Sequence, residues 1–301
     1  MLKFVILGTI ASYATAALHP VNKEIIEDIK NKATTWTPME HEENPLTSYT
    51  PEQIKSLLGT HVRGPIQGYT SPDVMNGMPK SFDSRAQWPE CIHPIRNQEQ
   101  CGSCWAFAAS EAFSDRICIT SGGKTNVIIS PEDLVSCDHT NMGCNGGYLN
   151  NAWTYLTKTG AVSDACFPYS AGKGNVPSCP ADACEVSGEE YKKYRCKSGS
   201  VVQATNPNQI KSEIMQNGPV ETGFTVYSDF MSYKSGIYQH TTGEMEGGHA
   251  VKIIGWGEEN GTNYWLVANS WGTSWGLEGL FKIKQGDCGI DEAVYACTPD
   301  V

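Results

Sequence analysis

The sequence is poor in basic residues. Its 301 residues include 22 Lys and Arg against 33 Asp and Glu, a formal net charge of -11, and no run of Lys or Arg. A positive footprint for nucleic acid is therefore missing, and an anionic membrane surface is disfavoured as a partner. The chain also lacks a glycine-rich loop between a strand and a helix, and a pair of CxxC motifs. We therefore expect no cofactor and no metal.

No apolar run reaches the roughly 20 residues that a membrane span requires. A short apolar stretch follows Lys3, from Phe4 to Ala11, and the small residues Ala14-Thr15-Ala16 come next. That order is typical of a secretory signal peptide, which we place at residues 1–17. The predicted location is the secretory pathway, ending in a lysosome, in a vacuole or outside the cell. Asn260-Gly261-Thr262 is then a candidate glycosylation site at Asn260.

Residues 18–78 contain no cysteine, whereas twelve cysteines follow from Cys91 onward. In an exported chain such cysteines predict disulfides. The cysteine-free segment holds an amphipathic stretch, Glu24 to Lys32, and a second short helical pattern around Ile54 to Leu58. This segment has too few apolar residues to fold alone. We predict a removable pro-segment at 18–78 that packs on the remainder, 79–301.

The remainder changes character along its length. Gly102 to Thr120 has the pattern of a helix buried on nearly all sides, while segments after about Lys192 alternate as strands do. We predict an α+β chain with a helical lobe at about 88–185 and a strand-rich lobe at about 186–297. A cleft is expected between the two lobes.

One cysteine stands in a distinctive setting, Cys101-Gly102-Ser103-Cys104-Trp105. Cys104 would open the buried helix, where unpaired N–H groups and the helix dipole favour a thiolate. A thiolate is the attacking form of cysteine, so we expect a lowered pKa and a nucleophile here. The alternative, one more disulfide partner or an inert buried thiol, is less consistent with the flanking residues.

A thiolate needs a cationic partner that can also donate a proton. His249 opens an apolar strand, and Asn269 lies on the next strand beyond a turn at Asn260-Gly261. A two-residue turn leaves His249 and Asn269 three positions out of line, roughly 10 Å, so we expect a bulge or a wider loop. The Asn269 amide oxygen would then orient the imidazole. Trp271 would keep water from that hydrogen bond.

Gln98, six residues before Cys104, offers a side-chain NH₂ to a developing oxyanion, beside the Cys104 backbone N–H. The alternative is a solvated loop glutamine.

These motifs together resemble those of the papain family of cysteine proteases. Cys144 to Tyr148, Asn217 to Val220, Gly247 to Ala250 and Tyr264 to Trp271 are most similar to cathepsin B, within a match from about Pro79 to Ala296. The resemblance implies a papain-like fold with a helical left lobe and a β-barrel-like right lobe. It also implies hydrolysis of protein and peptide substrates through an acyl-enzyme, a pro-segment that inhibits its own cleft, cystatin-like inhibitors and a monomer.

The resemblance further assigns residue roles. The catalytic set is Cys104, His249, Asn269 and Gln98, and the substrate-binding set is Gly146, Gly147, Tyr148, Gly248, Ala250, Trp271 and Ala293. The implied disulfides are Cys91–Cys118, Cys101–Cys144, Cys137–Cys179 and Cys166–Cys184, with Cys196 and Cys297 left as a fifth candidate pair and Cys288 unpaired.

Two departures from cathepsin B change the expected specificity. The region between Cys166 and Cys184 is short, and no histidine occurs between His139 and His240, so the occluding loop that grips a terminal carboxylate is not matched. We therefore predict an endopeptidase. Ala293 stands where cathepsin B has a pocket-floor glutamate, which predicts apolar P2 residues unless Asp291 or Glu292 reaches in. The alternatives are a peptidyl-dipeptidase, an inactive peptide-binding homologue, or acyl transfer to amines as a side reaction.

Overall fold

The structure is a computed structural model that describes residues 19–301, so the predicted signal peptide lies outside the described residues. The helices are α1 (Lys23–Lys32), α2 (Pro51–Ser56), α3 (Ser84–Gln87), α4 (Cys104–Thr120), α5 (Pro131–Cys137), α6 (Leu149–Lys158) and α7 (Pro207–Asn217). Short 3-10 turns are η1 (Pro45–Ser48), η2 (Gly143–Asn145), η3 (Ala171–Lys173) and η4 (Ser228–Ser232). Over residues 19–301, no helix is both long and apolar enough to cross a membrane.

The strands are β1 (Trp36–Pro38), β2 (Phe82–Asp83), β3 (Val202–Ala204), β4 (Val220–Tyr227), β5 (Tyr233–Tyr238), β6 (Met245–Glu259), β7 (Thr262–Ala268), β8 (Leu280–Lys284) and β9 (Val294–Ala296). They follow the order β1-β5-β8-β7-β6-β4-β9-β3, and β2 also pairs with β6. The path is open. The barrel-like expectation is therefore wrong, because the path ends on β1 and β3, strands of only three residues that each pair on one side.

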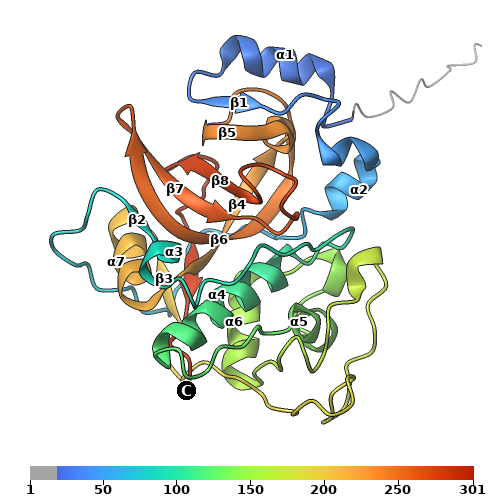
Figure 1. Ribbon diagram of the computed structural model, residues 1–301, viewed down its shortest axis with the longest axis vertical. Coiled ribbons are helices and arrows are strands. Elements are labelled where there is room, and N and C mark those ends of the chain that lie inside the picture. Colours follow the sequence, from blue (N-terminus) through green and yellow to red (C-terminus); the bar gives the residue numbers. More distant parts are fainter. Residues whose placement is uncertain (1–18) are drawn as a thin grey trace, which may run out of the picture.

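The two predicted lobes are present (Figure 1). α4, α5 and α6 pack together in the helical lobe, and α4 also lies against β6 and β4 of the strand-rich lobe. Because α4 is enclosed from both sides, residues from Cys104 to Cys118 are all buried. The helix begins at Cys104, two residues later than predicted, and its last turn closes through Gly123 N–H to the Cys118 carbonyl.

Helix α7 lies inside the strand-rich half and was not predicted from the sequence. Its signals are nevertheless present: the Asn206 side chain accepts from Gln209 N–H, Pro207 opens the first turn, and Gly218 follows with φ +102°. Asn-Pro at the start and glycine at the end of a helix are standard boundary residues.

The N-terminal segment from His19 to Met78 shares the core of the strand-rich lobe. Six of its side chains are buried in the same apolar cluster as the sheet residues: Val21, Ile29, Trp36, Leu46, Ile54 and Leu57. β1 also adds to the sheet edge at β5 (Figure 1). The apolar side chains of the short segment therefore belong to a core that it shares with the remainder of the chain.

Five disulfides form, and their pairs are Cys91–Cys118, Cys101–Cys144, Cys137–Cys179, Cys166–Cys184 and Cys196–Cys297. The free cysteines of the described chain are Cys104 and Cys288.

A buried charge cluster lies between the lobes, where α4 meets β6. Lys252 Nζ is 2.7 Å from Asp115 Oδ2 and 4.0 Å from Glu111 Oε2. Glu111 Oε1 is buried and has no hydrogen-bond partner among the described residues. Burial raises the pKa of Glu111 from 4.5 to about 7, against the opposing effect of Lys252. Below about pH 7 the folded chain therefore prefers the protonated form of Glu111.

This raised pKa predicts a pH-dependent stability. The contribution of Glu111 is fully present below about pH 4.5 and is lost as the pH rises through about 7, because unfolding lets the carboxyl ionise freely. At about 1.4 kcal/mol per pKa unit, the loss amounts to about 3 kcal/mol. We expect Glu111→Gln to remove this loss, measured by urea unfolding of the full chain at about pH 4.5 and about pH 7.5. Glu258→Gln, on an exposed part of β6, is the control, and an unchanged pH slope in Glu111→Gln would refute the assignment.

Candidate active site

His249 and Asn269 meet because β6 carries a bulge. Near the turn the paired residues are Glu259 with Thr262 and Gly255 with Leu266, but beyond the register shift Ile253 pairs with Val267. The shift reduces the offset of the two side chains from three positions to two. Since side chains alternate across a strand, an offset of two puts them on one face of the sheet. His249 Nε2–H donates to Asn269 Oδ1 at 2.7 Å.

Asn269 is held in turn by its neighbours. Its Oδ1 also accepts from Ser270 N–H at 2.8 Å. The Trp271 ring lies 4.7 Å from the His249 ring, and Trp275 packs edge-on against Trp271 at 5.0 Å. The imidazole therefore has a fixed orientation, and its hydrogen bond to the amide is covered from solvent. His249 Nδ1 is buried and has no hydrogen-bond partner within residues 19–301.

Cys104 is the first residue of α4, but its thiol is not activated in this form of the chain. Its side chain is completely buried, and its Sγ lies 3.0 Å from the Thr60 hydroxyl. Burial raises the pKa of the Cys104 thiol, and the hydrogen bond with Thr60 lowers it by less. The predicted lowering by the helix end is therefore wrong for this form, because the N-terminal segment keeps water from the sulfur.

The imidazole is neutral for the same reason. Burial lowers the pKa of His249 to about 4, although the hydrogen bond to Asn269 acts in the opposite direction. A thiol and a neutral imidazole are thus the forms that this enclosed site favours. Charged forms of both groups need water or a closely opposed partner.

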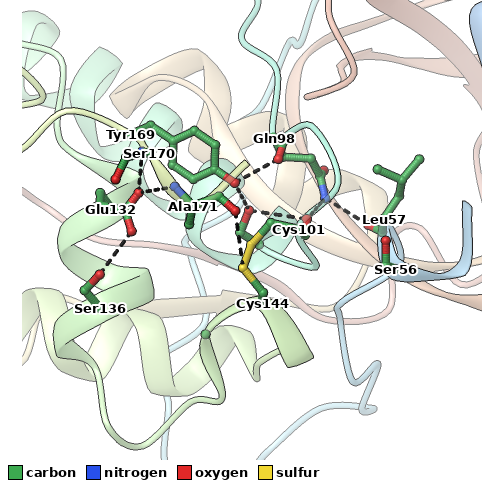
Figure 2. Close-up of a disulfide and its surroundings, with 12 residues drawn as sticks. Ser56, Leu57, Gln98, Cys101, Glu132, Ser136, Cys144, Tyr169, Ser170 and Ala171 are labelled. Carbon is green, nitrogen blue, oxygen red and sulfur yellow. Dashed lines mark hydrogen bonds between the residues drawn. A yellow bond between two sulfur atoms is a disulfide. The ribbon is translucent and has the colours of Figure 1, made fainter. Parts of the chain in front are cut away.

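The side-chain amide of Gln98 is held at both ends, and Figure 2 shows its nitrogen between the Cys101 and Leu57 carbonyls. Ser270 Oγ donates to Gln98 Oε1 at 2.7 Å, so the NH₂ group points the other way. That group donates to the Cys101 carbonyl at 2.8 Å and to the Leu57 carbonyl at 3.0 Å. Gln98 is completely buried and is not the solvated loop residue of the alternative reading.

Backbone pairing holds the N-terminal segment between the lobes. Gly147 N–H donates to the Gly59 carbonyl at 2.8 Å, and Thr60 N–H donates to the Gly248 carbonyl at 3.0 Å. Gly147 precedes α6 in the helical lobe, whereas Gly248 is part of β6. Gly146 has φ +109°, and a Cβ there would lie 2.6 Å from the Gly59 carbonyl oxygen. A Cβ at Gly248 would lie 2.1 Å from the Thr60 carbonyl oxygen. Gly146 and Gly248 therefore both admit a polypeptide at very close range.

The remaining predicted subsite residues are Tyr148, Ala250 and Ala293. The rings of Tyr148 and His61 pack at a tilt with their centroids 4.8 Å apart, and the Arg63 guanidinium lies 3.7 Å above the Tyr148 ring. Ala250 is buried in the apolar cluster that contains Cys104, so its side chain supports the site from beneath.

Ala293 lines a hollow with Gly223, Glu292 and Tyr295, against residues 61–63. Glu292 is exposed at this hollow, whereas the Asp291 carboxylate is held by Trp265 Nε1–H and Gly286 N–H.

Asn260 and Gly261 form the turn between β6 and β7, with φ values of 49° and 78°. Glu259 pairs with Thr262 across it, as expected for a two-residue hairpin turn. Asn260 is exposed, so the candidate glycosylation site is accessible.

Three contributors were not singled out from the sequence as parts of the site. They are the Thr60 hydroxyl, the Leu57 carbonyl and the Ser270 hydroxyl. A carbonyl has no sequence signal, and single hydroxyl residues are too common to indicate a site.

Comparisons with known proteins agree with this arrangement. The family model described as papain family cysteine protease matches residues 78–298. Cathepsin B-like cysteine proteinase 4 of Caenorhabditis elegans is 41% identical over 100% of both chains, and proteinase 5 of the same name is 45% identical over 76% of this chain and 77% of that one.

Two solved proforms have the same fold. The proCathepsin B S9 from Trypanosoma congolense superimposes with a TM-score of 0.84 and 33% identity, over 94% of this chain and 100% of that chain. The digestive procathepsin L2 proteinase from Tenebrio molitor larval midgut gives a TM-score of 0.76 and 31% identity, over 91% and 89%. The chain therefore belongs to the papain family and is a cathepsin B-like cysteine protease.

Proposed function

We propose that the chain is the zymogen of an endopeptidase in which Cys104 is the nucleophile and His249 the base. The observation that carries this is the position of the N-terminal segment. Its Leu57 carbonyl accepts from Gln98, and its Thr60 hydroxyl lies on the sulfur of Cys104. The Leu57 carbonyl oxygen thus already accepts from the Gln98 side-chain NH₂, the group that would donate to an oxyanion.

The proposed chemistry follows from the hydrogen bonds. Once the N-terminal segment leaves, His249 Nδ1 takes the thiol proton, while Nε2–H remains bonded to Asn269. The thiolate attacks the scissile carbonyl carbon, and the oxyanion binds Gln98 Nε2–H and the Cys104 N–H. The imidazolium then gives its proton to the leaving amine. In the second half, His249 activates water to hydrolyse the acyl-enzyme.

The proposed maturation divides the chain into three parts. Residues 1–17 direct export, residues 18–78 inhibit the cleft, and residues 79–301 form the mature enzyme. The packing of Leu57 and Thr60 against catalytic groups supports the inhibitory role of the middle segment. Export to a lysosome, a vacuole or the cell exterior is supported by the five disulfides, which form in oxidising compartments.

The proposed specificity is for internal bonds that follow an apolar P2 residue. The hollow at Ala293 has no charge at that position to pair with arginine, and the segment between Cys166 and Cys184 has no histidine to grip a terminal carboxylate. Among residues 19–301, Glu292 is the one carboxylate that lines this hollow, and it would raise tolerance of P2 arginine.

A positional peptide library tests both parts at once. We expect the activated enzyme to cut internal bonds and to give higher kcat/KM with P2 leucine than with P2 arginine. Equal values for the two residues would contradict the P2 assignment. Efficient stepwise removal of C-terminal dipeptides would favour the peptidyl-dipeptidase instead, and no cleavage would favour the inactive binding homologue.

A substitution of Gln98 tests the oxyanion role. Gln98→Ala removes one of two donors to the oxyanion, a loss that typically lowers kcat by about 10²–10³. We expect that decrease with little change in KM, because the interaction is made in the transition state. Steady-state kinetics of the matured variant measures it, and an unchanged kcat would remove Gln98 from the mechanism.

A further inference from the structure

The edge of strand β5 receives β1 as an added antiparallel strand. Trp36 pairs with Gly236 and Thr37 with Ser235, and Ile237 N–H donates to the Thr35 carbonyl at 2.7 Å. Figure 1 shows β1 between β5 and α1, at the margin of the strand-rich lobe. The contact is therefore separate from the pairing at Gly147 and Gly248.

The edge is built for an indole. Trp36 is only 4% exposed, and its Nε1–H donates to the Gln239 carbonyl at 3.0 Å and to Thr241 Oγ1 at 3.2 Å. Its ring lies 5.1 Å from the Tyr238 ring and 6.2 Å from that of Tyr233. The hollow thus satisfies the polar N–H of the indole and also buries its apolar face.

Gly236 makes this close approach sterically feasible. Its φ is +88°, and a Cβ at that position would lie 2.4 Å from the Thr35 carbonyl oxygen and 2.7 Å from Trp36 Cα. Both values are too short for any side chain larger than hydrogen. Glycine at position 236 is therefore required for the β1 backbone to lie this close to the β5 edge.

Removal of residues 18–78, as proposed above, would leave this edge without its partner. Tyr233 and Tyr238 would keep their places, since both also pack on Phe230 within the mature part. The β5 main chain would offer unpaired N–H and C=O groups beside an empty, indole-sized hollow. An extended segment that supplies both a strand and an indole would satisfy all of these groups.

We propose that this β5 edge, once vacated, is a second substrate-docking site, which binds an extended Trp-containing segment of a protein substrate at a distance from Cys104. The inference rests on the proposed maturation. The N-terminal segment itself demonstrates that one polypeptide occupies both places, with Trp36 at the β5 edge and Gly59 at Gly147. Tethered docking raises the local concentration of the cleavable stretch without any new contact in the cleft.

The test uses matured wild-type enzyme and two substrates that differ in one residue. Each joins the same cleavable peptide, through a flexible linker, to the sequence of residues 34–40, and one of them carries Trp36→Ala. We expect kcat/KM to be about tenfold higher with the tryptophan form, mainly through KM. A free peptide of residues 34–40 should cancel this advantage without inhibiting cleavage of the short substrate alone.

The outcomes separate this inference from the proposed function. Equal kcat/KM for the two tethered substrates, with normal cleavage of the short peptide, would overturn the docking site and leave the protease assignment intact. Failure to cleave the short peptide would count against the proposed function itself. An enzyme variant, Gly236→Ala, should abolish the advantage of the tryptophan form. Retention of the full advantage in that variant would also overturn the docking site.

Discussion

Replacing Cys104 by serine is expected to lower kcat by about 10⁶, the scale of loss when a nucleophile or base is removed from such a pair. A serine hydroxyl stays protonated beside His249, whereas the attacking form must be an anion. The chain should still fold, because serine is nearly isosteric with cysteine and the Thr60 hydroxyl can bond to it as it does to sulfur. Steady-state hydrolysis of a fluorogenic peptide by the matured protein measures the loss.

The second free cysteine provides a matched control. Cys288 is not among the proposed catalytic or substrate-binding residues. Its Sγ donates to Asp287 Oδ1 at 3.0 Å. Burial raises the pKa of the Cys288 thiol, which makes it a poor nucleophile. The Cys288→Ser enzyme should therefore keep its activity, and a thiol-directed epoxide should still label its Cys104. A Cys104→Ser enzyme that still hydrolyses peptides, or a Cys288→Ser enzyme that does not, would contradict the assignment.

Substituting Gly59 by alanine is expected to weaken inhibition by the N-terminal segment about 10- to 100-fold. A Cβ at Gly59 would lie 1.9 Å from the Gly102 carbonyl oxygen and 2.4 Å from its carbon. Both atoms are backbone, held at the start of α4, so the segment itself must shift. Overpacking of this kind typically costs about 1–3 kcal/mol. The measurement is the rate at which an epoxide labels Cys104 in the intact zymogen.

The control for this experiment lies five residues further along the same segment. A Cβ at Gly64 would meet nothing within 4 Å. Gly64→Ala should therefore label as slowly as the wild-type zymogen, while Gly59→Ala labels about 10- to 100-fold faster. Equal rates for all three proteins would mean that close contact at Gly59 does not keep the cleft shut.

The grouping of the proposed catalytic residues could be anticipated in part from sequence, because each stands in a recognisable local setting. Cys104 lies within a short motif and opens a helix whose apolar pattern is plain, and the turn at Asn260-Gly261 sets the pairing of two strands. The sequence also indicated that simple pairing leaves His249 and Asn269 three positions apart. The bulge between Ile253 and Gly255 could not be located in advance, since it depends on packing across the sheet.

Long-range features escaped prediction for physical reasons. The direction of the thiol pKa depends on how completely a distant segment covers Cys104, and no motif reports burial. The joining of β1 to β5 unites residues about 200 positions apart, so a three-residue strand shows no periodicity of its own. Helix α7 is different, because its boundary residues were visible and were outweighed by the strand patterns around it.

The charge state of Cys104 before and after maturation decides whether the N-terminal segment is what keeps the thiol protonated. The rate of alkylation of Cys104 should be followed against pH in the zymogen and in the mature enzyme, with Cys104→Ser as the blank. We expect slow alkylation in the zymogen and, in the mature enzyme, a thiolate that persists well below the usual thiol pKa of about 8.5. A mature enzyme whose Cys104 titrates at or above that value would contradict this expectation.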